Sequence, residues 1–408
     1  MRTEETRANI AVIGAGWWSQ GWHLPSLHRN PRATIAAIVD TSAHPKSPLN
    51  PNLEPLAVLQ EKYQTRIFSS VEDLLKDPNL GPFLDGVVIA TPHATHYTVA
   101  RQVIDELDRR QQLEGQQHRP LHILMEKPMS TDIQHALALY RLIQAHTGQS
   151  QFWVNHSANY RIPPQVARQA VTSGRIGRVK KIMGFFASPL NWIFEDPANT
   201  GWNVPSQGML GNGFAWGQSS HLLAWIFHVC PHIQPIDVFC SMIHSETTGA
   251  DVAHSATIRC RDETNEEKRA TSKDDENLVL MNISGTSMLP GNAHSDPPVG
   301  KQVRVKIFGT EGSILFNGED RDPESGRLEL RRSDGSIEVL YDKFEFENLD
   351  HDGLGPESLQ SFVQLCCGDK DNLYVGANVV DGLRSVQTIE AMYRSHQSFQ
   401  PEKTILPE

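Results

Sequence analysis

Glu126, Lys127 and Pro128 form a charged turn that directly follows a short apolar run, residues 123–125. The run is typical of a buried parallel strand, and open α/β sheets bind ligands outside the carboxyl ends of such strands. A lysine that is shielded from water there has a lowered pKa, so it can exchange a proton near neutral pH. We therefore regard Lys127 as a candidate general acid or base. The alternative is a solvated Glu-Lys pair without a chemical role.

A second stretch that could bind a ligand lies near the N-terminus, where Gly14 and Gly16 separate two apolar runs. Gly14 permits a tight turn, and Gly16 lets a pyrophosphate approach the backbone at the start of the following helix. Ser19 stands where the third glycine of a dinucleotide-binding turn usually lies. Asp40 ends the second run, where a carboxylate accepts hydrogen bonds from ribose hydroxyls and repels a ribose phosphate. We therefore predict that the chain binds NAD, with NADP as the alternative.

The elements that must position these residues alternate in type as far as about residue 146. Apolar runs predict strands, and the amphipathic stretches between them predict helices. This alternation is the signature of an α/β fold with a doubly wound parallel sheet. The strands are expected at residues 9–13, 34–39, 85–90 and 123–125. Polar or Pro- and Gly-rich stretches predict surface loops at residues 42–55, 109–120, 262–277 and 287–300.

The composition restricts the class of protein. The 408 residues suffice for two domains of ordinary size, and 39% hydrophobic with 21% charged residues is typical of a globular chain. The 37 basic and 48 acidic side chains give a net charge of -11. This charge argues against a surface that binds nucleic acid or anionic membrane, because both need a basic patch. We therefore expect no nucleic-acid or membrane partner.

The cysteines and the N-terminus bear on location. Five cysteines, an odd number without a C-x-x-C pair, suit reduced thiols in the cytoplasm better than a disulfide framework. The first nine residues lack the apolar segment of a signal peptide, and no apolar run is long enough to span a bilayer. We expect a cytoplasmic protein without a metal site.

Three motifs, VIGAGWW, DGVVIATPHATH and MEKP, resemble in their order and spacing those of the Gfo/Idh/MocA oxidoreductases, named for glucose-fructose oxidoreductase and inositol dehydrogenase. The second motif usually reads Thr-Pro-Asn-x-x-His, and here His93 replaces the Asn. The resemblance continues through residues 154–161 and 305–313, and residues 376–395 resemble the family's C-terminal helix. It implies a Rossmann dinucleotide-binding domain at 1–150, followed by an α/β domain at 151–408 with a large open, mostly antiparallel sheet that serves substrate binding and oligomerisation.

The resemblance also implies roles for individual residues. For His156, Tyr160, Arg161, Trp192 and Gln218 it implies contact with the substrate, and a purely structural role is the alternative for each. The residues it implies for the cofactor are Gly14, Gly16, Trp17, Trp18, Ser19, Asp40, Thr91, Pro92, His96, Glu126 and Lys127.

His221 is the second catalytic candidate, and it rests on the resemblance. Many family members have Asp-x-x-x-His at this point, with both side chains facing the substrate. In this chain Gly217 occupies the Asp position, and Gln218 lies beside it. Gln218 can supply a hydrogen bond but not the negative charge that would raise the pKa of His221.

The resemblance implies an oxidoreductase that transfers a hydride between a nicotinamide cofactor and a CH-OH group of a sugar, polyol or related molecule. The expected assembly is a homodimer or homotetramer. Two alternatives stay open because Gly217 replaces the family's Asp. One is an NAD-dependent glycosidase, and the other is a non-catalytic dinucleotide-binding regulator of the same fold.

Overall fold

The computed structural model describes residues 7–111, 119–146, 149–264, 277–292, 298–346, 355–369 and 375–407. The chain divides into two compact units, each with its own sheet. The first comprises Met1–Ser130, Gln134–Tyr160 and Asn348–Val379, and the second comprises Thr131–Ile133, Arg161–Glu347 and Val380–Glu408. Much of the predicted loops at 109–120 and 262–277, and part of the loop at 287–300, lie outside the described residues.

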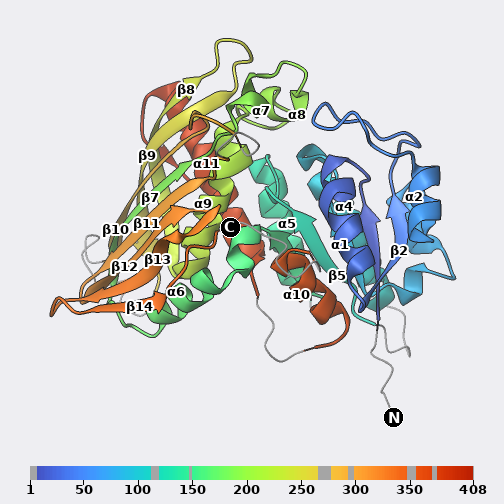
Figure 1. Ribbon diagram of the computed structural model, residues 1–408, viewed down its shortest axis with the longest axis horizontal. Coiled ribbons are helices and arrows are strands. Elements are labelled where there is room, and N and C mark those ends of the chain that lie inside the picture. Colours follow the sequence, from blue (N-terminus) through green and yellow to red (C-terminus); the bar gives the residue numbers. More distant parts are fainter. Residues whose placement is uncertain are drawn as a thin grey trace. The chain divides into compact units, whose positions relative to one another are not determined.

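The sheet of the first unit has seven strands among the described residues, in the order β15-β6-β5-β4-β1-β2-β3 (Figure 1). Strands β1 to β6 run parallel to one another, and β15 is antiparallel to β6. The central strands are Val- and Ile-rich and buried on both faces, as parallel strands are. The predicted Rossmann-type sheet is confirmed. Its strands are β1 (Ala8–Ile13), β2 (Ala33–Val39), β3 (Arg66–Phe68), β4 (Gly86–Ile89), β5 (His122–Glu126), β6 (Phe152–Asn155) and β15 (Ala377–Asn378).

Helices cover this sheet, and one of them comes from the C-terminal part of the chain. Leu359, Phe362 and Val363 of that helix, α10, pack in one apolar cluster with Ile10 and Val12 of β1. The helices are α1 (Leu24–Arg29), α2 (Leu56–Tyr63), α3 (Val71–Lys76), α4 (His96–Gln111), α5 (Ile133–Ala145) and α10 (Glu357–Cys366). Shorter helical turns are η1 (Ser19–His23), η2 (Gly81–Phe83), η3 (His93–Thr95) and η4 (Ser157–Tyr160).

The sheet of the second unit has nine strands among the described residues, in the order β14-β13-β12-β11-β7-β10-β9-β8-β16. Its pairings are antiparallel except for β7 with β10, so the predicted mostly antiparallel sheet is confirmed. The strands are β7 (Val179–Ala187), β8 (Ile233–His244), β9 (Asp251–Asp262), β10 (Leu278–Thr286), β11 (Gln302–Gly309), β12 (Gly312–Glu319), β13 (Asp322–Arg332), β14 (Ile337–Tyr341) and β16 (Glu402–Lys403).

Helices lie along one face of this sheet (Figure 1). Every residue of α9 is buried, which fits its almost continuous apolar sequence. On the other face, Met183, Leu280 and Phe308 stay exposed while their neighbours along the strands are buried. The helices are α6 (Ile162–Thr172), α7 (Asn191–Glu195), α8 (Thr200–Asn203), η5 (Ala215–Ser219), α9 (Ser220–Val229) and α11 (Val379–Ser398).

Some boundaries differ from those expected. The insertion predicted from residue 109 begins later, because α4 continues to Gln111. The helix predicted for 376–395 begins at Val379, because Ala377 and Asn378 pair with β6 as strand β15. Apolar periodicity is a local pattern. It does not show that the first residues of a predicted helix will instead pair with a strand that is distant in the sequence.

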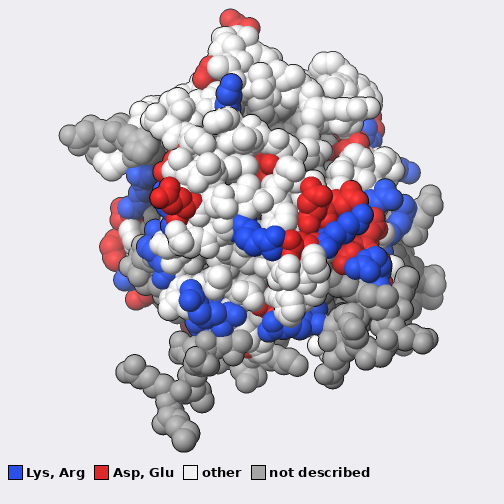
Figure 2. All heavy atoms as spheres, turned by 90° about the vertical axis from the view of Figure 1, so that its right-hand side faces the viewer, with Lys and Arg blue, Asp and Glu red and all other residues white. Residues whose placement is uncertain are grey.

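The surface, the cysteines and the helices add three findings. Figure 2 shows basic and acidic side chains intermixed on the described part of one face. The five cysteines form no disulfide among the described residues, as the sequence predicted. A search of the described helices finds none with the length and apolar character needed to cross a bilayer.

Candidate functional site

The turn after β1 has the geometry expected of the glycine motif. Gly14 has φ +98°, and a Cβ there would lie 2.6 Å from the carbonyl oxygen of Ala90, so only glycine fits. A Cβ on Gly16 would meet no protein atom within 4 Å. The Ser19 hydroxyl donates to the Gly14 carbonyl over 2.5 Å. Ser19 thus closes the turn, and Gly16 faces open space.

Asp40 lies at the end of β2 and braces the same turn. Its Oδ2 accepts the Ala15 backbone N–H over 2.8 Å, and its Oδ1 accepts that of Ser42 over 2.9 Å. Each oxygen has a further lone pair that can accept a hydroxyl.

Glu126 is the centre of a hydrogen-bond network at the end of β5. Its Oε1 accepts from Trp18 Nε1 over 2.9 Å, from His23 Nε2 over 2.9 Å and from Asn155 Nδ2 over 2.6 Å. Burial acts to raise the pKa of Glu126, but the bonds from His23 and Asn155 and the charges of His23 and Lys127 hold it below its ordinary value. Glu126 is therefore an anchored carboxylate, and it fixes the Trp18 indole beside the end of β5.

Trp18 belongs to an aromatic group that begins at the glycine turn. Its ring centroid lies 5.7 Å from that of Trp17 and 5.5 Å from that of Trp22, and the side chain is 38% exposed. The group sits on a helical stretch that contains the π-helical turn η1. Such turns are frequent at functional sites.

His96 connects two turns at this edge of the first sheet. Its Nδ1 lies 2.9 Å from the Pro128 carbonyl oxygen, and its Nε2 lies 3.0 Å from that of Thr91. The turns after β4 and β5 are therefore held together beside the Lys127–Pro128 peptide bond, which is cis. Burial lowers the pKa of His96, while the two carbonyl bonds act against it. Thr91 also accepts a hydrogen bond from the Thr95 hydroxyl over 2.8 Å, and Pro92 is exposed.

Lys127 is half-buried, and its backbone N–H donates to Glu126 Oε2 over 3.3 Å. Its charge influences two imidazoles. Burial lowers the pKa of His93 to about 4, with His96 and Lys127 contributing, and it lowers that of His156 to about 3, with Lys127 contributing. Both rings are therefore neutral near pH 7, where an imidazole can donate one hydrogen bond and accept another.

His221 lies in the second unit, buried near the start of α9. The π-helical turn η5 precedes it and carries Gly217 and Gln218. A Cβ on Gly217 would lie 3.2 Å from the Phe194 ring and 3.4 Å from the Trp202 ring. A side chain at this position would therefore be in tight contact with two aromatic rings.

Asp251 and Tyr393 hold the segment before His221. The buried Asp251 accepts the Ala215 N–H through Oδ2 over 2.9 Å and the Tyr393 hydroxyl through Oδ1. A Cβ on Gly213 would clash with Asp251, and one on Gly211 would clash with the Tyr393 ring. Burial raises the pKa of Asp251 to about 7.

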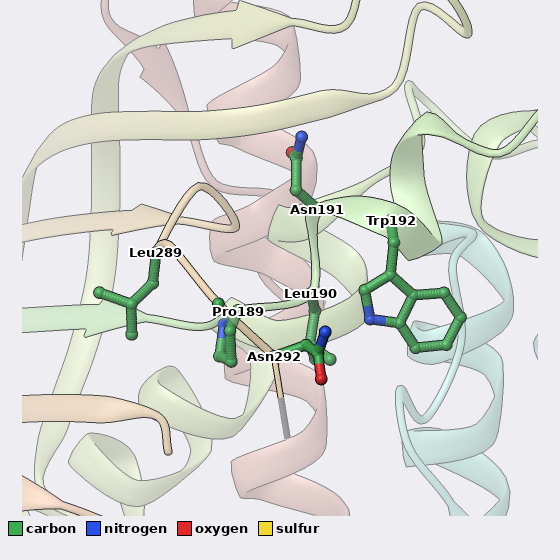
Figure 3. A pocket seen from close by; sticks show the side chains of 7 residues that line it. Pro189, Leu190, Asn191, Trp192, Leu289 and Asn292 are labelled. Carbon is green, nitrogen blue, oxygen red and sulfur yellow. The ribbon is translucent and has the colours of Figure 1, made fainter. Parts of the chain in front are cut away.

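The predicted substrate residues fall in different surroundings. Tyr160 lies in the core of the first unit, against Trp153. Arg161 belongs to the second unit, where its buried guanidinium pairs with Glu345 over 3.2 Å. Gln218 is partly buried, and Trp192 is 50% exposed and lines a cavity (Figure 3). Their contacts with a substrate stay predictions.

Sequence reasoning missed His23 and Asn155, which share Glu126 as acceptor, and it missed Asp251 and Tyr393. Asn155 lies at the end of β6, so its position beside the end of β5 could have been inferred from the parallel pairing. No signal in the sequence joins Asp251 to Tyr393, because they come from β9 and α11.

Comparisons with known proteins bear on the family and the fold. Residues 8–156 match the model of an oxidoreductase family with an NAD-binding Rossmann fold, Gfo/Idh/MocA. The chain is 22% identical over 329 residues to an uncharacterized oxidoreductase of Synechocystis sp., covering 78% of this chain and 74% of that protein.

Two further proteins are similar to this chain. It is 24% identical over 261 residues to the levoglucosan dehydrogenase of Pseudarthrobacter phenanthrenivorans, covering 59% of this chain and 57% of that protein. The crystal structure of the WlbA dehydrogenase from Bordetella pertussis, in complex with NADH and UDP-GlcNAcA, superposes with a TM-score of 0.64 at 18% identity. It covers 98% of this chain and 99% of that one.

Proposed function

Through residues 8–156 the chain belongs to the Gfo/Idh/MocA family of NAD-binding oxidoreductases, and from this premise we propose that it transfers a hydride between NAD and a CH-OH group of a sugar or polyol. The observation that carries the proposal is the arrangement at one edge of the first sheet. In the strand order β5-β4-β1-β2, the turns bearing Lys127, Thr91, Gly14 and Asp40 all follow carboxyl ends of parallel strands. This is the position at which such sheets bind dinucleotides.

The residues of this edge fit a dinucleotide. The open space at Gly16 would admit a pyrophosphate next to the backbone, and Asp40 would accept the ribose hydroxyls. We propose that NAD binds more tightly than NADP, because the Asp40 carboxylate would repel a ribose phosphate. Dissociation constants for the two cofactors, measured by calorimetry, test this preference, and tighter NADP binding would contradict it.

Bound NAD would supply the hydride acceptor, and the chain must then move the hydroxyl proton. Lys127 is the proposed acid/base group, because it is half-buried at a strand end and the neighbouring imidazoles are neutral. Glu126 would keep Trp18 and the start of the Lys127 turn in place. His221, in the second unit, is proposed as a further acid/base group or hydroxyl ligand, and a separate variant tests it.

Turnover with a small set of substrates tests the proposal. The protein is mixed with NAD and with levoglucosan, D-glucose or myo-inositol, and reduction is followed by the nicotinamide absorbance. We expect reduction with at least one of them. Release of nitrophenol from nitrophenyl glycosides without net cofactor change would instead support the glycosidase. Binding of NAD with neither reaction would support the regulator.

We also propose that copies of the chain associate through the exposed face of the second sheet. Met183, Leu280 and Phe308 leave an apolar surface there, mixed with charged residues, of the kind that interfaces cover. Light scattering should give the mass of a dimer or tetramer, and Met183→Glu should lower it. A monomer at micromolar concentration would contradict the proposal.

A further inference from the structure

The helical stretch after the glycine turn departs from α-helical spacing. In η1 the Leu24 N–H donates to the carbonyl of Ser19, which is the hydrogen bonding of a π-helix. In an α-helix of 3.6 residues per turn, side chains at positions i and i+5 point about 140° away from each other. The wider π-helical turn brings such side chains closer to one side of the helix. Trp18 and His23 have this spacing, with one residue at each end of the turn.

The side chains of Trp18 and His23 meet at one carboxylate oxygen. Trp18 Nε1 and His23 Nε2 each lie 2.9 Å from Glu126 Oε1, at the end of β5. An α-helix in place of η1 would turn one of the two rings away from Glu126. The π-helical turn is therefore the feature that lets both rings bind the same carboxylate.

The buried His23 ring makes one hydrogen bond within the described residues, and its partner is Glu126. The other ring nitrogen, Nδ1, is buried and has no partner there. A carboxylate only accepts, so Nε2 carries the proton of the bond to Glu126. Glu126 also accepts from Asn155 Nδ2 over 2.6 Å through Oε1 and from the Lys127 backbone N–H over 3.3 Å through Oε2.

His23 also affects how readily Glu126 keeps its charge. Burial acts to raise the pKa of the Glu126 carboxyl, and the hydrogen bond and the charge of His23 are the largest influences that lower it. Asn155 and Lys127 lower it further with smaller effects. Without His23 the effect of burial would gain weight, and the pKa of Glu126 would rise. A protonated carboxyl carries a hydrogen on one oxygen, so it accepts fewer donors.

Three further titratable groups interact with the charge of Glu126. They are Lys127, His96 at the start of α4, and His156 after β6. Burial lowers the pKa of His96, and it lowers that of His156 to about 3. All three groups are the same in the two variants of His23 compared below, so a difference between those variants does not come from them.

We propose that His23 is a positioning residue for the reaction at Lys127. It acts through Glu126, whose Oε1 then holds the Trp18 indole and whose Oε2 holds the backbone of Lys127. The proposal rests on the proposed function in one respect, that Lys127 moves the proton. The effect of His23 on the charge of Glu126 can be measured without a cofactor or a substrate.

The indole N–H of Trp18 reports on Glu126, because it donates to that carboxylate. Its NMR resonance, in the full chain with isotope-labelled tryptophan, is identified by its loss in Trp18→Phe. His23→Gln and His23→Leu are compared, since neither new side chain titrates. Gln keeps an N–H donor and should leave the resonance constant from about pH 8 to about pH 5. In His23→Leu the resonance should shift with a midpoint inside this range, because burial then raises the pKa of Glu126.

Kinetics with NAD and a sugar that is oxidised in the screen above test the positioning role. His23→Leu should lower kcat by on the order of tenfold or more with little change in KM for the sugar, because a displaced proton carrier loses its alignment. His23→Gln should restore most of the rate lost in His23→Leu. The control is His28→Leu, the same substitution at an exposed histidine of α1, and it should leave kcat unchanged.

A double-mutant cycle shows whether His23 acts through Glu126. Glu126→Gln should also lower kcat, and the double variant of His23→Leu with Glu126→Gln should be no slower than Glu126→Gln alone. A double variant that multiplies the two single losses would overturn the proposal, as would a Trp18 resonance that stays constant in His23→Leu. If His23→Leu does not fold, retention of most of kcat in His23→Gln together with slow turnover in Glu126→Gln supports the proposal, and any other combination overturns it.

The same variants separate this proposal from the proposed function. A Trp18 resonance that titrates in His23→Leu but not in His23→Gln, without NAD reduction by any sugar, would leave the hold of His23 on Glu126 intact and refute the oxidoreductase. NAD reduction at the parent rate in His23→Leu would support the oxidoreductase and refute the positioning role.

Discussion

Gly16 is a position where a substitution reports on the ligand rather than on the fold. A side chain there meets no protein atom within 4 Å, and its backbone needs no positive φ. Gly16→Val should therefore fold normally and lose NAD affinity by at least about tenfold, because the side chain occupies the space proposed for the pyrophosphate. Calorimetry with NAD measures this, and circular dichroism checks the fold. Undiminished binding would show that the dinucleotide lies elsewhere.

Lys127 is the residue on which the proposed chemistry depends. Lys127→Ala should lower kcat by about a hundredfold or more, the usual effect of losing a positioned proton carrier, with little change in NAD affinity. The matched control is Lys76→Ala, which breaks an exposed pair with Glu72 and should change neither rate nor stability measurably. If Lys127→Ala turns over at the parent rate, the proton moves through another group, and His221→Ala is the next variant to measure.

Gly217 stands where the resemblance places an Asp, and two aromatic rings lie close to it. Restoring the family's residue by Gly217→Asp would press a carboxylate against the Phe194 and Trp202 rings. We expect a lower melting temperature and no gain in turnover, because a buried carboxylate without a partner is costly. A variant that is as stable as the parent and faster would show that the rings yield and that His221 regains its usual partner.

At the scale of elements, the turn η5 depends on contacts from β9 and α11. Tyr393→Phe removes the hydroxyl that donates to the buried Asp251, and it should lower the free energy of unfolding by about 1–3 kcal/mol. Tyr97→Phe is the control, since the Tyr97 hydroxyl makes no hydrogen bond within the described residues. Urea denaturation compares the two. Equal midpoints would mean that the pair does not support this segment.

The elements themselves were largely predictable, whereas their partners were not. The runs around Ile10 and Val88 predicted strands because a buried parallel strand needs continuous apolar residues. The packing of α10 on β1, the pairing of β15 with β6 and the bond from Tyr393 to Asp251 join residues far apart in the sequence. No local pattern encodes such contacts. Of the proposed site, the sequence predicted the glycine turn and MEKP but not the donors His23 and Asn155.

At the scale of the whole molecule, buried imidazoles set the response of stability to acid. Burial lowers the pKa of His122 and His254 to about 4, and the pKa values of His93 and His156 are about 4 and about 3. In the unfolded chain each titrates near 6.5. Between about pH 6.5 and pH 4 the unfolded state therefore binds more protons than the folded state, and stability falls as the pH falls. The pKa of Asp251 is raised to about 7, so this carboxyl makes the folded state more stable as the pH falls through the same range. The effect of this single group is opposed by that of the four histidines.

The melting temperature should therefore decrease steadily from pH 7 to pH 4, well before the carboxylates as a whole are protonated. Scanning calorimetry in buffers of equal ionic strength measures this dependence. His254→Asn removes one of the four histidines and keeps a polar side chain. It should therefore reduce the slope of the free energy of unfolding against pH by the contribution of about one proton. His28→Asn, at an exposed histidine, is the control and should leave the slope unchanged. A melting temperature that is constant or rises toward pH 4 would mean that the buried imidazoles are already charged in the folded protein.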